Sequence, residues 1–211
     1  MTRLVVLVSG RGSNLAALLD AIDAGRCAAT VVAVLADRPA PALERAADRG
    51  IATATVPFRR GDRDAWSAEL ADAVQAYAPD LVVLAGFMRV LAPSFVGRFR
   101  RRILNVHPSL LPAFPGARAP EQALAAGVAI TGCTVHLVDE GVDTGPILAQ
   151  AAVPVAADDD VATLHERIRR AEHRLLPAVV GAVASGTLAL PSGTWLDASY
   201  PDRPLFAPEL E

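Results

Sequence analysis

The sequence predicts an α/β protein with a doubly wound, mostly parallel, Rossmann-like sheet that carries helices on both faces. Short β-branched apolar runs alternate with Ala- and Leu-rich segments of helical period. Several of these runs are apolar at nearly every position, as strands are when a parallel sheet is buried on both faces. The apolar content is 52% over 211 residues, which is enough for one sizeable core.

The elements are expected in the following chain order. The first half predicts strands at 4–8, 30–35, 53–56, 81–85 and 103–106, with helices at 15–24, 42–48 and 65–76. Right-handed crossovers between these strands then give a doubly wound sheet. A proline-rich loop over 108–120 follows, then a short helix at 121–126 and strands at 131–138 and 147–153. The last element is a long helix at 161–184, which contains Pro177 and ends at Ser185-Gly186.

All 20 basic residues are arginine, so the chain contains no lysine. This excludes a Schiff-base lysine, a pyridoxal phosphate anchor and a Walker A lysine. A formal charge of −3 without a basic tail argues against nucleic acid as a partner. The one basic cluster, at 98–102, is interpreted as a solvated helix end, with a ligand site as the alternative.

Cysteine usage and hydropathy indicate a cytoplasmic protein. Cys27 and Cys133 are too few and too far apart for a disulfide framework, and neither lies in a metal-type pair. No segment approaches the 18 or so apolar residues of a membrane helix, so no membrane partner is expected.

A glycine-rich loop joins the first predicted strand to the first helix, with the residues Ser9-Gly10-Arg11-Gly12-Ser13-Asn14. Free N–H groups and the helix dipole favour an anion here, so the loop predicts a cradle for a phosphate monoester. Two alternatives stay open. One is a dinucleotide site with Asp37 on the ribose, although Leu15 replaces the third glycine of that fingerprint. The other is an ordinary turn capped by Ser13 or Asn14.

A polar block follows the fifth strand and begins Asn105-Val106-His107-Pro108. Strand alternation places Asn105 and His107 on the same side, at the sheet edge where open α/β sheets bind ligands. An amide donor beside an imidazole suits acyl or formyl transfer. The acidic turn 139–146 supplies a carboxylate partner for His107, or is simply a β-turn. A cis bond is expected at Leu111-Pro112.

Other chemistries lack their motifs. His165-Glu166 begins like a zinc-binding helix, but Arg169 stands where the second histidine is required, so no metal site is predicted. No nucleophile elbow is present. His136 is interpreted as a packed strand histidine.

Five blocks together resemble the phosphoribosylglycinamide formyltransferase family, which is folate-dependent and serves purine synthesis. They are Ser9 to Leu15, Ala85 to Leu91, Asn105 to Pro112, Phe114-Pro115-Gly116 and Asp143 to Pro146. The resemblance extends from Val5 to about Leu196 and implies the formyltransferase fold. It implies one domain over 1–211, with a phosphate-binding half of about 1–100, a catalytic and folate half of about 101–190 and a coil tail at 191–211.

The resemblance also implies site residues. Catalytic roles fall on Asn105, His107 and Asp143. It assigns binding of the phosphate of 5-phosphoribosylglycinamide (GAR) to Gly12, Ser13 and Asn14, and further contacts with GAR to Arg169 and Glu172. The residues that it assigns to folate binding are Arg63, Met88, Arg89, Val90, Leu91, Asp139, Glu140, Gly141 and Val142. One position departs from the family, because Arg118 stands where a histidine is usual. We assign it no proton-transfer role, although an arginine there could still meet phosphate.

The implied reaction is direct attack of the GAR amine on the formyl carbon of 10-formyltetrahydrofolate, without an acyl-enzyme or a metal. GAR and the folate co-substrate are the expected partners, and the protein is expected to be a monomer or homodimer. Three alternatives stay open. A methionyl-tRNA formyltransferase would need a further basic domain, and a formyltetrahydrofolate deformylase usually carries a regulatory domain before the first strand. A non-catalytic binding module would leave Asn105, His107 and Asp143 unexplained.

Overall fold

A computed structural model describes residues 1–190 and has the predicted α/β architecture. One seven-stranded sheet runs in the order β3-β2-β1-β4-β5-β6-β7. The first five strands are parallel, and β6 and β7 complete the sheet antiparallel to their neighbours. The strands are β1 Thr2–Val8, β2 Ala29–Ala36, β3 Ala52–Thr55, β4 Leu81–Leu84, β5 Ile103–His107, β6 Ile130–Leu137 and β7 Ile147–Pro154.

Six helices accompany the sheet in the described part of the chain. They are α1 Ser13–Asp23, α2 Pro41–Ala47, α3 Arg63–Gln75, α4 Pro93–Arg98, α5 Ala119–Ala125 and α6 Val161–Ala184. Each predicted helix and strand is present, with boundaries that differ by one or two residues. Helix α4 was not predicted from the sequence. It has only six residues, and the basic run after it conceals its apolar side, Phe95 and Val96.

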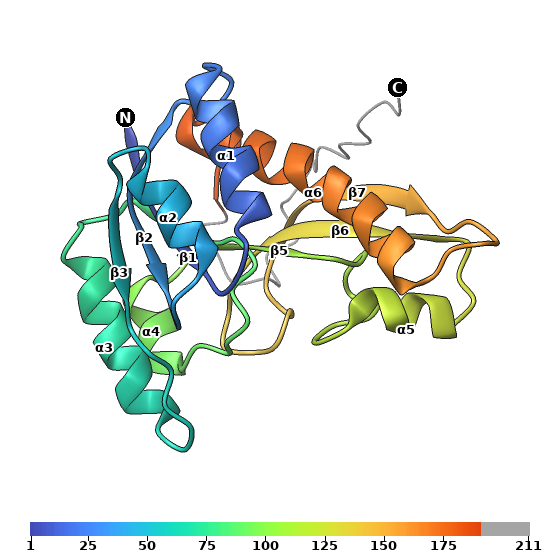
Figure 1. Cartoon of the computed structure of the whole chain (residues 1–211), viewed down its shortest axis with the longest axis horizontal. Helices are drawn as coiled ribbons and strands as arrows, with labels where there is room; N and C mark the ends of the chain where they lie inside the picture. The colour runs from blue at the N-terminus through green and yellow to red at the C-terminus, as the bar shows by residue number, and fades with distance from the viewer. Residues whose placement is uncertain (191–211) are drawn as a thin grey trace.

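Two apolar cores cover the two faces of the sheet. Because neighbouring side chains on a strand point to opposite faces, Leu4 and Val6 of β1 join a core with α1, α2 and α6. Val5 and Leu7 join the other core, which contains buried aromatic side chains of α3 and α4 such as Trp66. Helices therefore cover both faces, as a doubly wound sheet requires (Figure 1).

The proline-rich loop after β5 is anchored by side chains of β6 and β7. The Thr134 hydroxyl donates to the Ser109 carbonyl at 2.7 Å, and the Gln150 amide donates to the Leu111 carbonyl at 2.8 Å. The Leu111-Pro112 bond is cis, as predicted. These contacts hold the loop beside the end of β5, where the predicted site lies.

Two further predictions concern the C-terminal tail and membrane-spanning helices. The coil tail predicted at 191–211 lies outside the described residues. Among residues 1–190, no helix is long and apolar enough to cross a membrane.

Candidate active site

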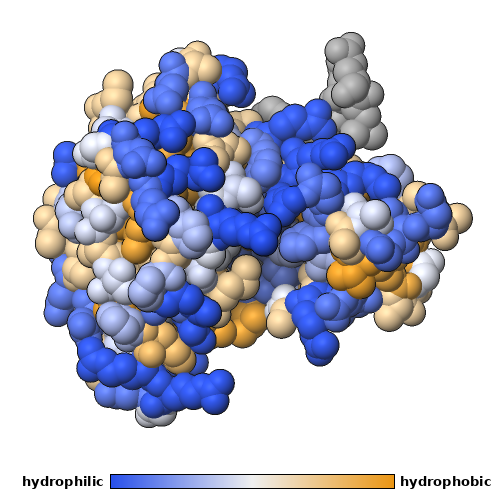
Figure 2. All heavy atoms as spheres, in the orientation of Figure 1, coloured by the Kyte–Doolittle hydropathy of each residue, from blue (hydrophilic) through white to orange (hydrophobic). Residues whose placement is uncertain are grey.

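A cavity of about 590 Å³ opens at the carboxyl edge of β4 and β5. It lies among the segment after β4, the end of β5, the loop before α5 and the acidic turn after β6. Figure 2 shows the surface indented between the part of the molecule that carries α1 to α4 and the part that carries α5. Asn105, His107 and Asp143 all line the cavity, so the structure brings together the three residues expected to be catalytic.

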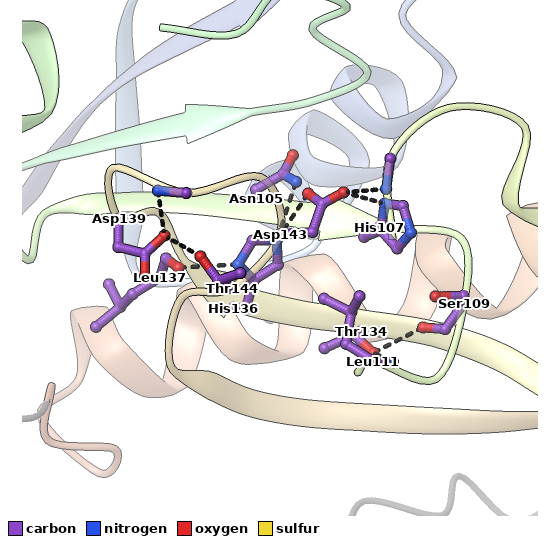
Figure 3. A network of polar contacts seen from close by, with 12 residues as sticks. Asn105, His107, Ser109, Leu111, Thr134, His136, Leu137, Asp139, Asp143 and Thr144 are labelled. Atoms are coloured by element: carbon purple, nitrogen blue, oxygen red, sulfur yellow. Dashed lines mark hydrogen bonds and ion pairs between the residues drawn. The ribbon is translucent and has the colours of Figure 1, made fainter. Parts of the chain in front are cut away.

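Asn105 and His107 lie two residues apart on β5 and point to the same side, as predicted (Figure 3). The antiparallel strand β6 pairs with this strand residue by residue, and its register sets His136 opposite Asn105 and Thr134 opposite His107. The polar side chains of two strands therefore face one space.

Asp143 reaches this space from the turn between β6 and β7. Its backbone is left-handed, with φ 54°. Its Oδ2 atom accepts the Gly116 N–H at 2.8 Å and lies 3.3 Å from Nδ1 of His107. Its Oδ1 atom lies 3.6 Å from Nε2 of His136. The carboxylate thus connects β5, β6 and the loop before α5.

The surroundings of Asp143 favour its ionised form. Burial raises the pKa of the carboxyl group. The interaction with His136, the Gly116 N–H and the nearby His107 together lower the pKa by more than burial raises it. The pKa therefore lies below its usual value. At neutral pH Asp143 is a carboxylate, which can accept a proton.

Each ring nitrogen of His107 faces an oxygen acceptor. Nε2 donates to the Phe114 carbonyl at 2.9 Å, because a carbonyl oxygen can only accept, and Nδ1 faces Asp143. Only the imidazolium form can donate to both. The 3.3 Å separation is longer than the 2.7–2.9 Å typical of charge-assisted hydrogen bonds, so the contact between Nδ1 and Asp143 is not a short one.

His136 belongs to this network, which the sequence analysis missed. Its Nδ1 atom donates to the Leu137 carbonyl at 2.8 Å, so in the neutral ring Nε2 accepts from the Asn105 amide at 3.1 Å. An amide nitrogen carries two hydrogens, so Asn105 can still donate one into the cavity. The signal that could have found His136 is the β5–β6 register, which a single strand pattern does not contain.

Most of the residues expected to bind folate line the cavity. Met88 is 72% exposed and, with Val90 and Val142, gives the cavity an apolar rim. The others that line it are Arg89, Leu91, Asp139 and Gly141. Arg63, at the start of α3, and Glu140 are not among the lining residues. The structure thus does not bring these two residues to this cavity.

Asp139 shapes the acidic turn. Its Oδ1 atom accepts the Gly141 N–H at 3.0 Å and the Thr144 hydroxyl at 2.7 Å. The turn also approaches the backbone closely, because a Cβ atom on Gly145 would lie 1.8 Å from the Leu137 carbonyl oxygen. The turn therefore requires glycine at this position in order to present Asp143.

The predicted phosphate loop lies outside this cavity, at the start of α1. Gly12 caps the helix with φ 72°, and neither Ser13 nor Asn14 caps it through a side chain. The turn alternative was therefore wrong about the capping residue. A Cβ atom on Gly12 would approach the Ala42 Cβ atom to 2.6 Å, so the loop also requires glycine here.

The structure brings two of the predicted GAR-binding residues into contact. The Asn14 amide donates to Glu172 Oε2 at 3.0 Å, which joins α1 to α6. Burial raises the Glu172 pKa to about 7, although the Asn14 bond and the charge of Arg169 oppose the rise. Arg169 forms an ion pair with Glu166 on the same helix.

The positions of Asp37 and Arg118 bear on two other sequence interpretations. The dinucleotide alternative needs Asp37 to accept a ribose hydroxyl, but this carboxylate has no exposed surface and bonds to Arg38 and Arg89. That alternative therefore has no support. Arg118 is the residue before α5 and has φ 60°. Its side chain is 77% exposed and lies 3.5 Å from Glu121 at the cavity rim.

The chain is similar in sequence and in structure to known proteins. Residues 2–180 match the family model described as "Formyl transferase". A phosphoribosylglycinamide formyltransferase from Mycobacterium tuberculosis is 55% identical over 184 residues, which cover 87% of this chain and 85% of that protein. Glycinamide ribonucleotide transformylase 1 from Symbiobacterium toebii is 47% identical with a TM-score of 0.87, over 91% of this chain and 92% of that one.

A solved structure of different chemistry is also similar. A formyltetrahydrofolate deformylase from Pseudomonas syringae is 28% identical with a TM-score of 0.84, over 91% of this chain and 64% of that one. The fold is therefore common to a transferase and a deformylase. Their distinction depends on the acceptor of the formyl group and not on the architecture.

Proposed function

Because this chain belongs to the phosphoribosylglycinamide formyltransferase family, we propose that Asn105, His107 and Asp143 carry out its reaction. That reaction transfers the formyl group of 10-formyltetrahydrofolate to the amine of GAR in purine biosynthesis. The single observation that supports the assignment is the convergence of an amide donor, an imidazole and a carboxylate on one cavity, with His107 Nδ1 3.3 Å from Asp143.

In the proposed reaction the protein stabilises an oxyanion, accepts a proton from the attacking nitrogen and returns a proton to the leaving nitrogen. The neutral GAR amine attacks the formyl carbon, and the carbonyl oxygen becomes an oxyanion. The free hydrogen of the Asn105 amide and an N–H of the His107 ring stabilise this charge. Asp143 accepts the proton from the attacking nitrogen, and N10 of the folate receives a proton as the C–N bond breaks. The carboxylate is thus restored and tetrahydrofolate leaves.

Placing two substrates in one site supplies much of the remaining rate. Effective molarity of well-oriented reactants accounts for roughly 7–11 kcal/mol of a barrier. We assign the folate to the apolar rim around Met88 and Val142. We assign the GAR phosphate to the N–H groups near Gly12 and Asn14, which need no lysine. Arg63, Glu140 and Arg169 remain predicted ligand contacts.

One assay separates this function from its alternatives. The protein is mixed with 10-formyltetrahydrofolate, with and without GAR, and tetrahydrofolate release is followed. Release that requires GAR supports the transferase. Release that ignores GAR identifies a deformylase, which the likeness to the Pseudomonas syringae enzyme makes the specific alternative. No release in either mixture identifies a binding module, and an Asp143→Ala variant serves as the inactive control.

We further infer that the reaction proceeds without a metal ion, since the proposed steps use only side chains and substrates. The test is activity after exhaustive treatment with a chelator, which should remain unchanged. The single domain over 1–211, the cytoplasmic location and the monomeric or homodimeric state stay predictions. Sedimentation of the purified protein tests the last of these.

A further inference from the structure

Asp37 is a buried carboxylate that the proposed reaction does not use. It follows β2, its side chain has no exposed surface, and its Oδ2 atom accepts from Arg38 at 2.8 Å and from Arg89 at 2.6 Å. Its Oδ1 atom has no hydrogen-bond partner among residues 1–190. A buried charge is costly unless it is paired. The two arginines offset this cost, and the role of the buried pair is the question.

The ion pair keeps Asp37 charged. Burial raises the pKa of the carboxyl group, but the bonds from Arg38, Ser9 and Arg89 lower it below its usual value. The Arg89 guanidinium also lies 4.1 Å above the ring of Phe58. The Arg89 side chain is thus held from two directions, by a carboxylate and by an aromatic face.

The segment that carries Arg89 is a wall of the cavity. Each residue from Gly86 to Leu91 lines it. This wall has no regular secondary structure to stiffen it. Phe87 and Leu91 anchor it in the apolar core. Two hydrogen bonds also tie it to the residues that follow β1 and β2: the Met88 N–H donates to the Ser9 hydroxyl at 2.8 Å, and Arg89 donates to Asp37.

Asp37 itself does not line the cavity, so it acts on a ligand only through the wall. We propose that Asp37 is a positioning residue, which holds the Gly86–Leu91 wall through Arg89 and thereby sets the affinity for the folate co-substrate. The proposal rests on the proposed function, because it takes the occupant of this wall to be folate.

The affinity for folate depends on the fraction of molecules in which the wall is correctly placed. If only a fraction of the molecules hold the wall in its competent position, the apparent dissociation constant rises by the inverse of that fraction. Removing the charge of Asp37 leaves the Arg89 guanidinium bound to a neutral partner and weakens this restraint. A competent fraction of about one tenth would raise the constant about tenfold. Asn105, His107 and Asp143 are untouched, so turnover at saturation is retained.

The experiment compares Asp37→Asn with the unchanged protein. We expect the KM for 10-formyltetrahydrofolate to rise about tenfold, while kcat and the KM for GAR stay within about twofold. Arg38→Ala is the matched control, because Arg38 bonds to the same carboxylate oxygen but is 48% exposed and does not line the cavity. Its folate KM should stay within about twofold.

Arg89→Ala keeps the proposal testable if Asp37→Asn does not fold. It should raise the folate KM at least as much as Asp37→Asn does, because Arg89 itself lines the cavity. The double variant should be no worse than Arg89→Ala alone, since contacting residues are not additive. An unchanged folate KM in Asp37→Asn would overturn the proposal. So would an equal loss for both substrates, which indicates a general loss of structure.

Direct titration with tetrahydrofolate separates this proposal from the proposed function. Binding requires no formyl transfer, so an Asp37→Asn protein that binds tetrahydrofolate about tenfold more weakly supports the positioning role even if the transferase assay fails. Equal binding by the two proteins overturns it, whatever the transferase assay shows.

Discussion

Nδ1 of His107 lies 3.3 Å from Oδ2 of Asp143. The two residues come from different elements, since His107 ends β5 and Asp143 lies in the turn between β6 and β7. The Gly116 N–H bonds to the same carboxylate oxygen at 2.8 Å. The contact therefore depends on two loops that close over one strand end, and it divides the proton chemistry between an imidazole and a carboxylate.

Removing either member of this pair should abolish formyl transfer. We expect His107→Ala and Asp143→Ala to retain the fold, because both side chains border a cavity rather than an apolar core. Transfer is followed by tetrahydrofolate release, and folding by circular dichroism. Near-normal turnover in either variant would remove the mechanistic assignment.

Asn105→Ala should lower kcat by about 10² to 10³, which is the usual cost of one oxyanion donor. The KM for each substrate should change little, because the bond strengthens only as the charge develops. Steady-state kinetics with each substrate varied in turn measures this. A rise in KM with an unchanged kcat would assign Asn105 to ground-state binding instead.

His136→Phe should lower kcat by less than the loss of Asn105 itself. The change removes the acceptor that orients the Asn105 amide, whose nitrogen lies 3.1 Å from Nε2 of His136, but keeps the donor. If His136 acts only through Asn105, the double variant His136→Phe/Asn105→Ala should be no slower than Asn105→Ala. Fully additive losses would contradict that.

Glu172 predicts a pH-dependent stability. Burial raises its pKa from 4.5 to about 7, so between these values the folded protein holds a proton that the unfolded chain releases. Its contribution to stability is therefore greatest below pH 4.5, decreases as the pH rises toward 7 and is lost above that. The full loss, from below pH 4.5 to above pH 7, is on the order of 3 kcal/mol. Urea unfolding at pH 5 and pH 8 should show a larger decrease for the unchanged protein than for Glu172→Gln, and equal decreases would refute the prediction.

Gly145→Ala should abolish activity while the sheet remains folded. The added Cβ atom would lie 1.8 Å from the Leu137 carbonyl oxygen, so the turn must move and take Asp143 with it. Gly97→Ala is the matched control, because its Cβ atom would meet nothing within 4 Å. That change sits in α4 and should alter stability by no more than about 1 kcal/mol. Turnover and thermal unfolding of the two variants provide the comparison.

Local patterns were sufficient for the fold class and for half of the site. Period-two alternation on β5 already places Asn105 and His107 on one side, and the apolar runs locate the strands to within one or two residues. The short helix α4 was missed, since six residues contain too little periodicity to stand out from the arginine run that follows.

Contacts between distant segments could not be obtained in this way. The bond between His136 and Asn105 depends on the β5–β6 register. The bond between Asp37 and Arg89 depends on the sheet order, which places β2 and β4 on either side of β1. Arg63 was expected at the folate but is not among the residues that line the cavity, so its contact stays a prediction. The pattern of apolar and polar residues in a sequence indicates which side chains of each segment are buried and which face water. Which buried groups then meet is decided by the packing of the whole chain, because pairing each polar group lowers the cost of burying it.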